Sequence, residues 1–326
     1  MKAHRNSIRG ATVVITGASS GIGQATAEAF ARQGARLVLV ARDGGATEAV
    51  AQDCRDLGAD ALAIAADITD AMAITEVVQQ AADYGGGIDI WVSNVGTGAV
   101  GAFHEVPIEA HEQVVRTNLI GHMNDAHAVL PVFLRQRRGV FINMISLGGF
   151  AAAPYAAAYS ASKFGLRGFA EALRGELMHE PGIHICDIYP SFVDTPGIAH
   201  GANYTGRELS APPPMLDARR VADAIVAVAA RPRPTTMLGA PTALIRLAHA
   251  VSPELTTRAT ALFLESYFRR APRTAIDGGT LFRPPASPGG IDGGLRSPAQ
   301  RPTVTGVALG LAALGVVAVA LKGRRR

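Results

Sequence analysis

Short apolar runs alternate with longer amphipathic stretches along most of the chain. The apolar runs are rich in β-branched residues and end at glycine or polar residues, as buried strands do. They cover residues 11–16, 36–41, 62–66, 89–93, 140–145, 184–189 and 235–238. Apolar residues recur with helical spacing over residues 75–82, 112–134 and 221–230. This alternation predicts an α/β fold, a Rossmann-like doubly wound parallel sheet with helices on both faces, in a single domain.

The last third of the chain follows a different pattern. Residues 244–268 contain amphipathic helical stretches, for which packing on the body is the default expectation, with a pocket cap, a subunit contact or a bilayer contact left open. Glycine and proline become frequent over residues 276–303, which predicts a flexible linker. Residues 304–321 carry no charge and precede a basic tail at 322–326. As a helix they would span about 27 Å, close to the hydrocarbon thickness, so we expect a C-terminal transmembrane helix.

The charge of the chain is concentrated at its end. Net charge is +4, and the last five residues contribute four positive charges, so the remaining body is neutral. A neutral body does not call for a nucleic-acid partner. The two cysteines, Cys54 and Cys186, lie far apart without a CxxC or zinc-site pattern, and we expect no metal. These features divide the chain into a body over 1–275 with a helical cap, a linker over 276–303, a membrane helix over 304–321 and a basic tail.

A glycine-rich turn links the first apolar run to a helical pattern. It reads Thr16 to Gly23, T-G-A-S-S-G-I-G, and the second apolar run follows the helix. In such a βαβ unit the glycines let the backbone approach a dinucleotide pyrophosphate at the helix N-terminus. An acidic residue after the second strand would favour NAD, whereas Arg42 stands here and suits the 2′-phosphate of NADP. A solvated loop arginine is the alternative for Arg42.

Polar and small residues stand where the predicted strands end. Ligands bind at the carboxyl ends of the strands in sheets of this kind. The sequence therefore predicts a single site at this edge of the sheet. The residues are Gly17, Arg42, Asp67, Asn94, Ser146 and Pro190.

A tyrosine and a lysine lie four residues apart in the stretch Y-S-A-S-K. Residues at this spacing share a helix face, so the Tyr159 hydroxyl and the Lys163 ammonium can reach one pocket. A nearby cation favours the phenolate and is expected to lower the pKa of Tyr159, which makes it a usable proton donor or acceptor. Lys163 is the one internal lysine among three. Tyr155 is a rival, but it lies two helical turns from Lys163.

These residues together resemble the short-chain dehydrogenase/reductase family of compact single-domain enzymes. The glycine turn matches the family's TGxxxGxG loop, Y-S-A-S-K matches its YxxxK, and Ser146 stands thirteen residues before the tyrosine. The resemblance covers about Arg9 to Leu238. Two departures affect cofactor geometry and substrate shape: the family's NNAG reads Ser93-Asn94-Val95-Gly96, and its PG reads Pro190-Ser191.

The resemblance implies a role for each matching residue. Tyr159 would transfer the proton, Lys163 would lower its pKa and bind the nicotinamide ribose, and Ser146 would hold the substrate oxygen. Asn118 would anchor a water that links Lys163 to solvent. The implied cofactor contacts are Gly17, Ser19, Ser20, Gly21, Ile22, Gly23, Arg42, Asp67, Asn94, Tyr159, Lys163, Val193 and Thr195.

The sequence thus predicts an NADP(H)-dependent oxidoreductase that interconverts a ketone or aldehyde and its alcohol. The run LGGFAAAPYAAA between Ser146 and Tyr159 has no charge, which suits a hydrophobic small-molecule substrate. The alternatives are a cofactor-retaining epimerase or dehydratase and a membrane-tethered NADP-binding protein without catalysis. We expect a catalytic domain in the cytoplasm, held at a membrane by the C-terminal helix. A homo-oligomer follows from the resemblance alone.

Overall fold

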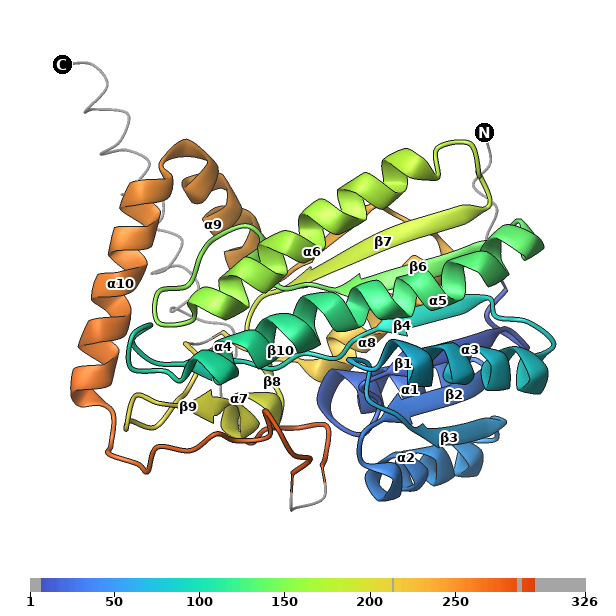
Figure 1. The fold of residues 1–326 in the computed structure, drawn as a ribbon, viewed down its shortest axis with the longest axis horizontal. Helices are drawn as coiled ribbons and strands as arrows, with labels where there is room; N and C mark the ends of the chain where they lie inside the picture. The colour runs from blue at the N-terminus through green and yellow to red at the C-terminus, as the bar shows by residue number, and fades with distance from the viewer. Residues whose placement is uncertain (1–6, 213, 286–288, 297–326) are drawn as a thin grey trace.

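The chain forms one central parallel sheet with helices on both faces (Figure 1). This computed structural model describes residues 7–212, 214–285 and 289–296. The main sheet has seven strands in the order β11-β7-β6-β4-β1-β2-β3, all paired in parallel. Its strands are β1 (Thr12–Thr16), β2 (Arg36–Ala41), β3 (Ala61–Ala65), β4 (Ile90–Ser93), β6 (Gly139–Met144), β7 (Ile183–Pro190) and β11 (Thr235–Leu238). The predicted doubly wound sheet is confirmed.

Two apolar cores lie on the two faces of the sheet. One packs α1 (Gly21–Ala31), α2 (Gly44–Asp56) and α8 (Ala218–Ala230) against the strands. The other packs α3 (Ala71–Gly85), α5 (Gly121–Gln136) and α6 (Ala157–Glu176). Strands covered on both faces must be apolar along their whole length, which explains the continuous runs in the sequence.

The predicted helix over 112–134 is longer than expected and is interrupted. It consists of α4 (Ile108–Val115), a π-helical turn η1 (Arg116–Ile120) and α5. A π turn shifts the hydrogen-bond ladder by one residue and re-aims the side chains within it. Asn118 lies in this turn and is fully buried.

Short elements and two further helices surround the carboxyl ends of the strands. They are β5 (Ala99–Val100), η2 (Leu147–Gly149), β8 (Val193–Asp194), α7 (Gly197–His200), β9 (Ala202–Asn203), β10 (Leu216–Asp217), α9 (Ala240–Val251) and α10 (Pro253–Arg270). Helix α10 packs on the loop before α6, where the rings of Tyr155 and Phe268 meet edge to face at 5.2 Å. The helices in the stretch 244–268 thus contact the body at this point.

The stretch after α10 differs from the flexible linker that its composition predicted. Leu281 is 1% exposed and Ile291 is 8% exposed, so both halves of the described stretch pack on the body. Glycine is required here because two backbone segments lie very close together: a Cβ at Gly293 would lie 2.5 Å from the Thr195 carbonyl oxygen. Composition could not distinguish this use of glycine from chain flexibility.

The predicted membrane helix at 304–321 and the basic tail lie outside the described residues. Among the residues that the structure describes, no helix is both long enough and apolar enough to cross a membrane.

Candidate active site

The glycine-rich turn between β1 and α1 forms a tight cradle. Gly17 and Gly21 adopt positive φ values of 71° and 54°, which favour glycine. A Cβ at Gly23 would lie 1.9 Å from the Gly17 carbonyl oxygen, so helix and turn approach too closely for any side chain. Ser20 is the N-cap residue of α1 but makes no side-chain capping hydrogen bond. The helix N-terminus is thus shaped for an anionic group, as the pyrophosphate of a dinucleotide would require.

Neighbouring strand ends support this cradle. The Asn94 side-chain amide donates to the Gly17 carbonyl at 3.2 Å, and a Cβ at Gly17 would meet Val95 at 3.1 Å. Asp67 follows β3 and accepts from the backbone N–H and the hydroxyl of Thr69, both at 2.9 Å. The carboxylate of Asp67 is therefore used by its own turn.

The residues implied on the other side of the cofactor come from the chain after β7. Val193 belongs to β8, and Thr195 follows it. A Cβ at Gly21 would lie 3.2 Å from the Thr195 Cβ, so Thr195 is seated directly on the glycine turn. Ser19 and Ile22 are half-buried within the turn and the first turn of α1.

Arg42 follows β2 and is exposed, but it is not a free loop charge. Its guanidinium donates to the carbonyl of Thr280 at 2.8 Å and to that of Leu281 at 3.4 Å. These partners come from the stretch after α10, which sequence patterns had not connected with the cofactor loop.

Tyr159 and Lys163 lie on the first two turns of α6, on the same side of the helix. The Lys163 Nζ lies 5.8 Å from the centre of the Tyr159 ring. The ring packs closely on a glycine, because a Cβ at Gly148 would lie 3.0 Å from its Cε1 atom. Tyr155 instead points to α10 and donates to Glu265 at 3.3 Å, so it does not compete for the role.

The pKa shifts of this pair differ from the expectation. Burial raises the pKa of Tyr159, and a hydrogen bond from Ser146 opposes this rise. Burial also lowers the pKa of Lys163 to about 7. Its Nζ donates to the Met144 carbonyl at 3.0 Å rather than to the phenol. The predicted lowering of the Tyr159 pKa by Lys163 is therefore not seen in this structure, because the amine is itself desolvated and turned to the backbone.

Ser146 stands just after β6 in a strained conformation. Its φ of 135° and ψ of 163° fall in a region that is essentially reserved for glycine. Its hydroxyl oxygen accepts from the Gly148 N–H at 3.2 Å. Holding a non-glycine residue in this region costs on the order of 1–3 kcal/mol, which indicates that the position of the hydroxyl matters.

The side-chain amide of Asn118 hydrogen-bonds the backbone of Thr97, close to Lys163. Its Oδ1 accepts from the Thr97 N–H at 2.8 Å, and its Nδ2 donates to the Thr97 carbonyl at 2.8 Å and to Ser162 Oγ at 3.2 Å. The side chain thus fixes the loop after β4. Oδ1 has a second lone pair, which could accept a hydrogen bond from the water implied by the resemblance.

Two buried groups beneath the site were missed from the sequence. The carboxylate of Asp125 accepts from Thr16 at 2.9 Å and from Ser93 at 2.6 Å, which ties α5 to β1 and β4. Burial raises the pKa of Asp125 to about 7. His122 is fully buried, with its Nε2 2.8 Å from the Val95 carbonyl oxygen. His122 and Asp125 follow Asn118 by four and seven residues, so all three share one helix face. This spacing was not enough to predict burial, because polar residues in a helix more often face solvent.

A small apolar cluster lies beside Tyr159. It joins helix α4, the start of α6 and the short strands β5 and β9, with Tyr204 and Tyr159 packed against it. Its buried members are Ala99, Val106, Ala110, Val114, Ala158, Ala202 and Leu281. The surroundings of the Tyr159 ring on this side are therefore apolar.

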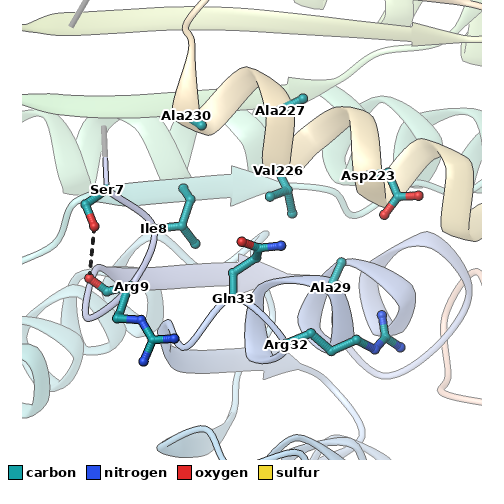
Figure 2. A pocket seen from close by; sticks show the side chains of 10 residues that line it. All are labelled: Ser7, Ile8, Arg9, Ala29, Arg32, Gln33, Asp223, Val226, Ala227 and Ala230. Atoms are coloured by element: carbon teal, nitrogen blue, oxygen red, sulfur yellow. Dashed lines mark hydrogen bonds between the residues drawn. The ribbon is translucent and has the colours of Figure 1, made fainter. Parts of the chain in front are cut away.

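A separate pocket lies between α1 and α8, next to the segment before β1 (Figure 2). Its lining includes Arg9, Gln33 and Asp223. It lies at the amino ends of the strands, and none of the site residues named above lines it. Ligands of such sheets bind at the opposite edge.

The sequence model of the short chain dehydrogenase family matches residues 11–202. An uncharacterized oxidoreductase of Staphylococcus epidermidis is 32% identical over 219 residues, which are 67% of this chain and 90% of that protein. A ketoacyl reductase of a Nostoc species is 30% identical over 67% of this chain and 75% of that protein. A metagenomic short-chain oxidoreductase solved in complex with NADP is 26% identical with a TM-score of 0.62, covering 72% of this chain and 98% of that one.

Proposed function

Because the chain belongs to the short-chain dehydrogenase family, we propose that it is an NADP(H)-dependent oxidoreductase acting on a hydrophobic ketone or aldehyde and its alcohol. The observation that carries the proposal is the convergence of Ser146, Tyr159 and Lys163 beside the glycine cradle. The NADP in the related oxidoreductase supports the choice of cofactor.

In the proposed reaction the residues of this chain hold and protonate the substrate oxygen. Bound NADPH supplies the hydride for the carbonyl carbon. Ser146 binds the carbonyl oxygen, and the Tyr159 phenol gives that oxygen its proton. The Tyr159 phenol is protonated at neutral pH and so has the proton that reduction needs. Burial raises its pKa, which weakens it as an acid, and the hydrogen bond from Ser146 opposes this rise.

Lys163 and Asn118 serve the proton supply in this proposal. The pKa of Lys163 is lowered to about 7 by burial, so its amine gains and loses a proton easily at neutral pH. Asn118 fixes the loop beside the amine and leaves one lone pair for a water. Reprotonation of Tyr159 would pass along this route after each turnover.

The apolar cluster beside Tyr159 supports a hydrophobic substrate, and the ketoacyl reductase among the relatives is named for a carbonyl substrate. An NADPH-oxidation screen of the full chain against aliphatic, aromatic and acyl carbonyls tests this. We expect turnover with at least one hydrophobic class and little with charged sugars. Cofactor binding with no turnover across the panel would favour a non-catalytic NADP-binding protein.

Arg42 would set the preference for the phosphorylated cofactor. Replacing Arg42 with Asp puts a carboxylate where a 2′-phosphate would lie, and like charges repel. We expect NADPH affinity to fall about 100-fold or more while NADH affinity changes less than about threefold, as measured by fluorescence titration. An unchanged ratio of the two affinities would contradict the assignment of Arg42.

Membrane attachment is a further part of the proposal. It rests on the uncharged stretch at 304–321 and the basic tail after it, with the catalytic domain on the cytoplasmic side. Fractionation of cells expressing the full chain should find it in the membrane pellet and released by detergent but not by salt. Recovery in the supernatant would contradict attachment.

A further inference from the structure

Two stretches after α10 cross the region of the glycine cradle. Residues 277–285 and 289–296 are here called the C-terminal strap, which runs beneath β9 and α7 in the view of Figure 1. The strap begins by pairing with β9, where the N–H of Asn203 donates to the Asp277 carbonyl at 2.7 Å. It ends at Asp194, next to Thr195. Between these points it touches two groups that the proposed cofactor needs.

The first contact is with Arg42. The guanidinium donates to the carbonyl oxygens of Thr280, at 2.8 Å, and Leu281, at 3.4 Å. Leu281 is 1% exposed and packs in the apolar cluster beside Tyr159, which fixes these carbonyls in place. Two of the five N–H donors of this guanidinium, the group expected to bind the 2′-phosphate, are therefore already bonded to backbone carbonyls of the strap.

The second contact is at the N-terminus of α1. The N–H of Gly21 donates to the Gly290 carbonyl at 2.8 Å. The preceding residue, Gly289, lies so close that a Cβ there would be 2.6 Å from the Ser20 Cβ and 2.9 Å from the Ser19 carbonyl oxygen. A backbone carbonyl thus covers the place where the cradle would receive a pyrophosphate.

Ion pairs and one apolar anchor hold the far end of the strap. Arg296 bonds Asp194, which is 2% exposed, at 3.2 Å and Asp217 at 2.8 Å. The N–H groups of Leu295 and Arg296 both donate to the Asp194 carboxylate at 3.0 Å. Ile291 adds to this by packing into the core beneath α1 and α8.

We propose that the C-terminal strap is an autoinhibitory element that occupies the Gly21 N–H and two donors of Arg42 until NADP(H) displaces it. The inference rests on the proposed function. At Gly21 the Gly290 carbonyl takes the single N–H that a phosphate oxygen would use, and one N–H cannot bond fully to both. At Arg42 the carbonyls of Thr280 and Leu281 compete with phosphate oxygens for two of the five guanidinium donors. A cofactor that binds only the open form has its apparent affinity reduced by the fraction of open chains.

Hydrogen exchange of the full chain, with and without saturating NADPH, tests displacement. The Leu295 and Arg296 N–H groups are protected by Asp194 in the closed form. We expect peptides that cover 289–296 to exchange faster when NADPH is bound. Slower exchange would mean that the strap closes over the cofactor, and this would overturn the proposal.

Two adjacent glycines provide a matched pair of variants. Gly289→Ala places a methyl group against the glycine turn and should lift the strap, whereas Gly290→Ala meets nothing within 4 Å. We expect Gly289→Ala to bind NADPH about threefold to tenfold more tightly, with faster association, and Gly290→Ala to match wild type. Thermal unfolding of both variants checks that the body is intact.

The outcomes separate the strap from the proposed function. Equal or weaker NADPH binding by Gly289→Ala would overturn the strap while leaving the oxidoreductase assignment in place. Failure of wild type and both variants to bind NADPH at all would overturn the proposed function and the strap with it.

Discussion

At the residue scale, burial governs the electrostatics of the catalytic candidates Tyr159 and Lys163. The spacing of Tyr159 and Lys163 placed both on one helix face, and the structure brings Ser146 next to them. The expected lowering of the Tyr159 pKa depended on where the amine points and how deeply it is buried. Neither is encoded in the spacing, and burial dominates both pKa shifts.

Ser146 should show the signature of backbone strain. At a position with φ of 135°, Ser146→Gly relieves strain, whereas Ser146→Ala retains it. We expect the free energy of unfolding of the glycine variant to be about 1 kcal/mol higher than that of the alanine variant. At positions with negative φ the alanine variant is usually the more stable of the two. Urea unfolding measures the difference. An alanine variant that is equally or more stable would contradict strain at this residue, whatever the activity of either.

Lys163 should make stability depend on pH. Its pKa is about 7 when folded and near 10.5 when unfolded, so between these values the unfolded chain binds more protons. Stability from this group is therefore present at high pH and is lost as pH falls towards 7. Relative to Lys163→Met, wild type should gain up to about 1.4 kcal/mol per pH unit between pH 7.5 and pH 9.5. A pH-independent difference in the free energy of unfolding would show that the amine stays charged.

At the element scale, the strands were predictable almost to the residue and the helices were not. Every predicted strand of the main sheet is confirmed. The five inner strands were continuously apolar because both of their faces are buried, whereas the edge strands β3 and β11 are only partly buried. The π turn at Arg116–Ile120 could not be foreseen, since its residues also fit an ordinary helix. Its effect is to carry Asn118 into the core beside Thr97.

Two glycines of α6 test how this helix is packed. A Cβ at Gly168 meets nothing within 4 Å, so Gly168→Ala should raise the free energy of unfolding by about 0.5–1 kcal/mol. A Cβ at Gly165 would lie 2.8 Å from the Leu119 side chain, so Gly165→Ala should gain less or lose stability. Chemical denaturation compares the two. A larger gain at Gly165 would contradict the packing of α6 against the π turn.

At the scale of the whole molecule, the sequence predicted which edge of the sheet carries the site, but it did not predict that the C-terminal strap covers that edge. Glycine turn, Arg42, Asn94 and Ser146 meet at one edge because parallel strands end together. The C-terminal strap was missed because glycine and proline serve both flexible linkers and close contacts. Only the three-dimensional position of Gly289, against Ser19 and Ser20, distinguishes the two uses.

The central claim is that the Tyr159 phenol delivers the proton during carbonyl reduction. Single-turnover oxidation of NADPH by Tyr159→Phe, with a carbonyl substrate from the screen, tests it most directly. The variant keeps the ring that packs on Gly148 and should bind NADPH like wild type, but reduce the carbonyl at least about 100-fold more slowly. A single-turnover rate within about twofold of wild type, with NADPH bound, would contradict the account.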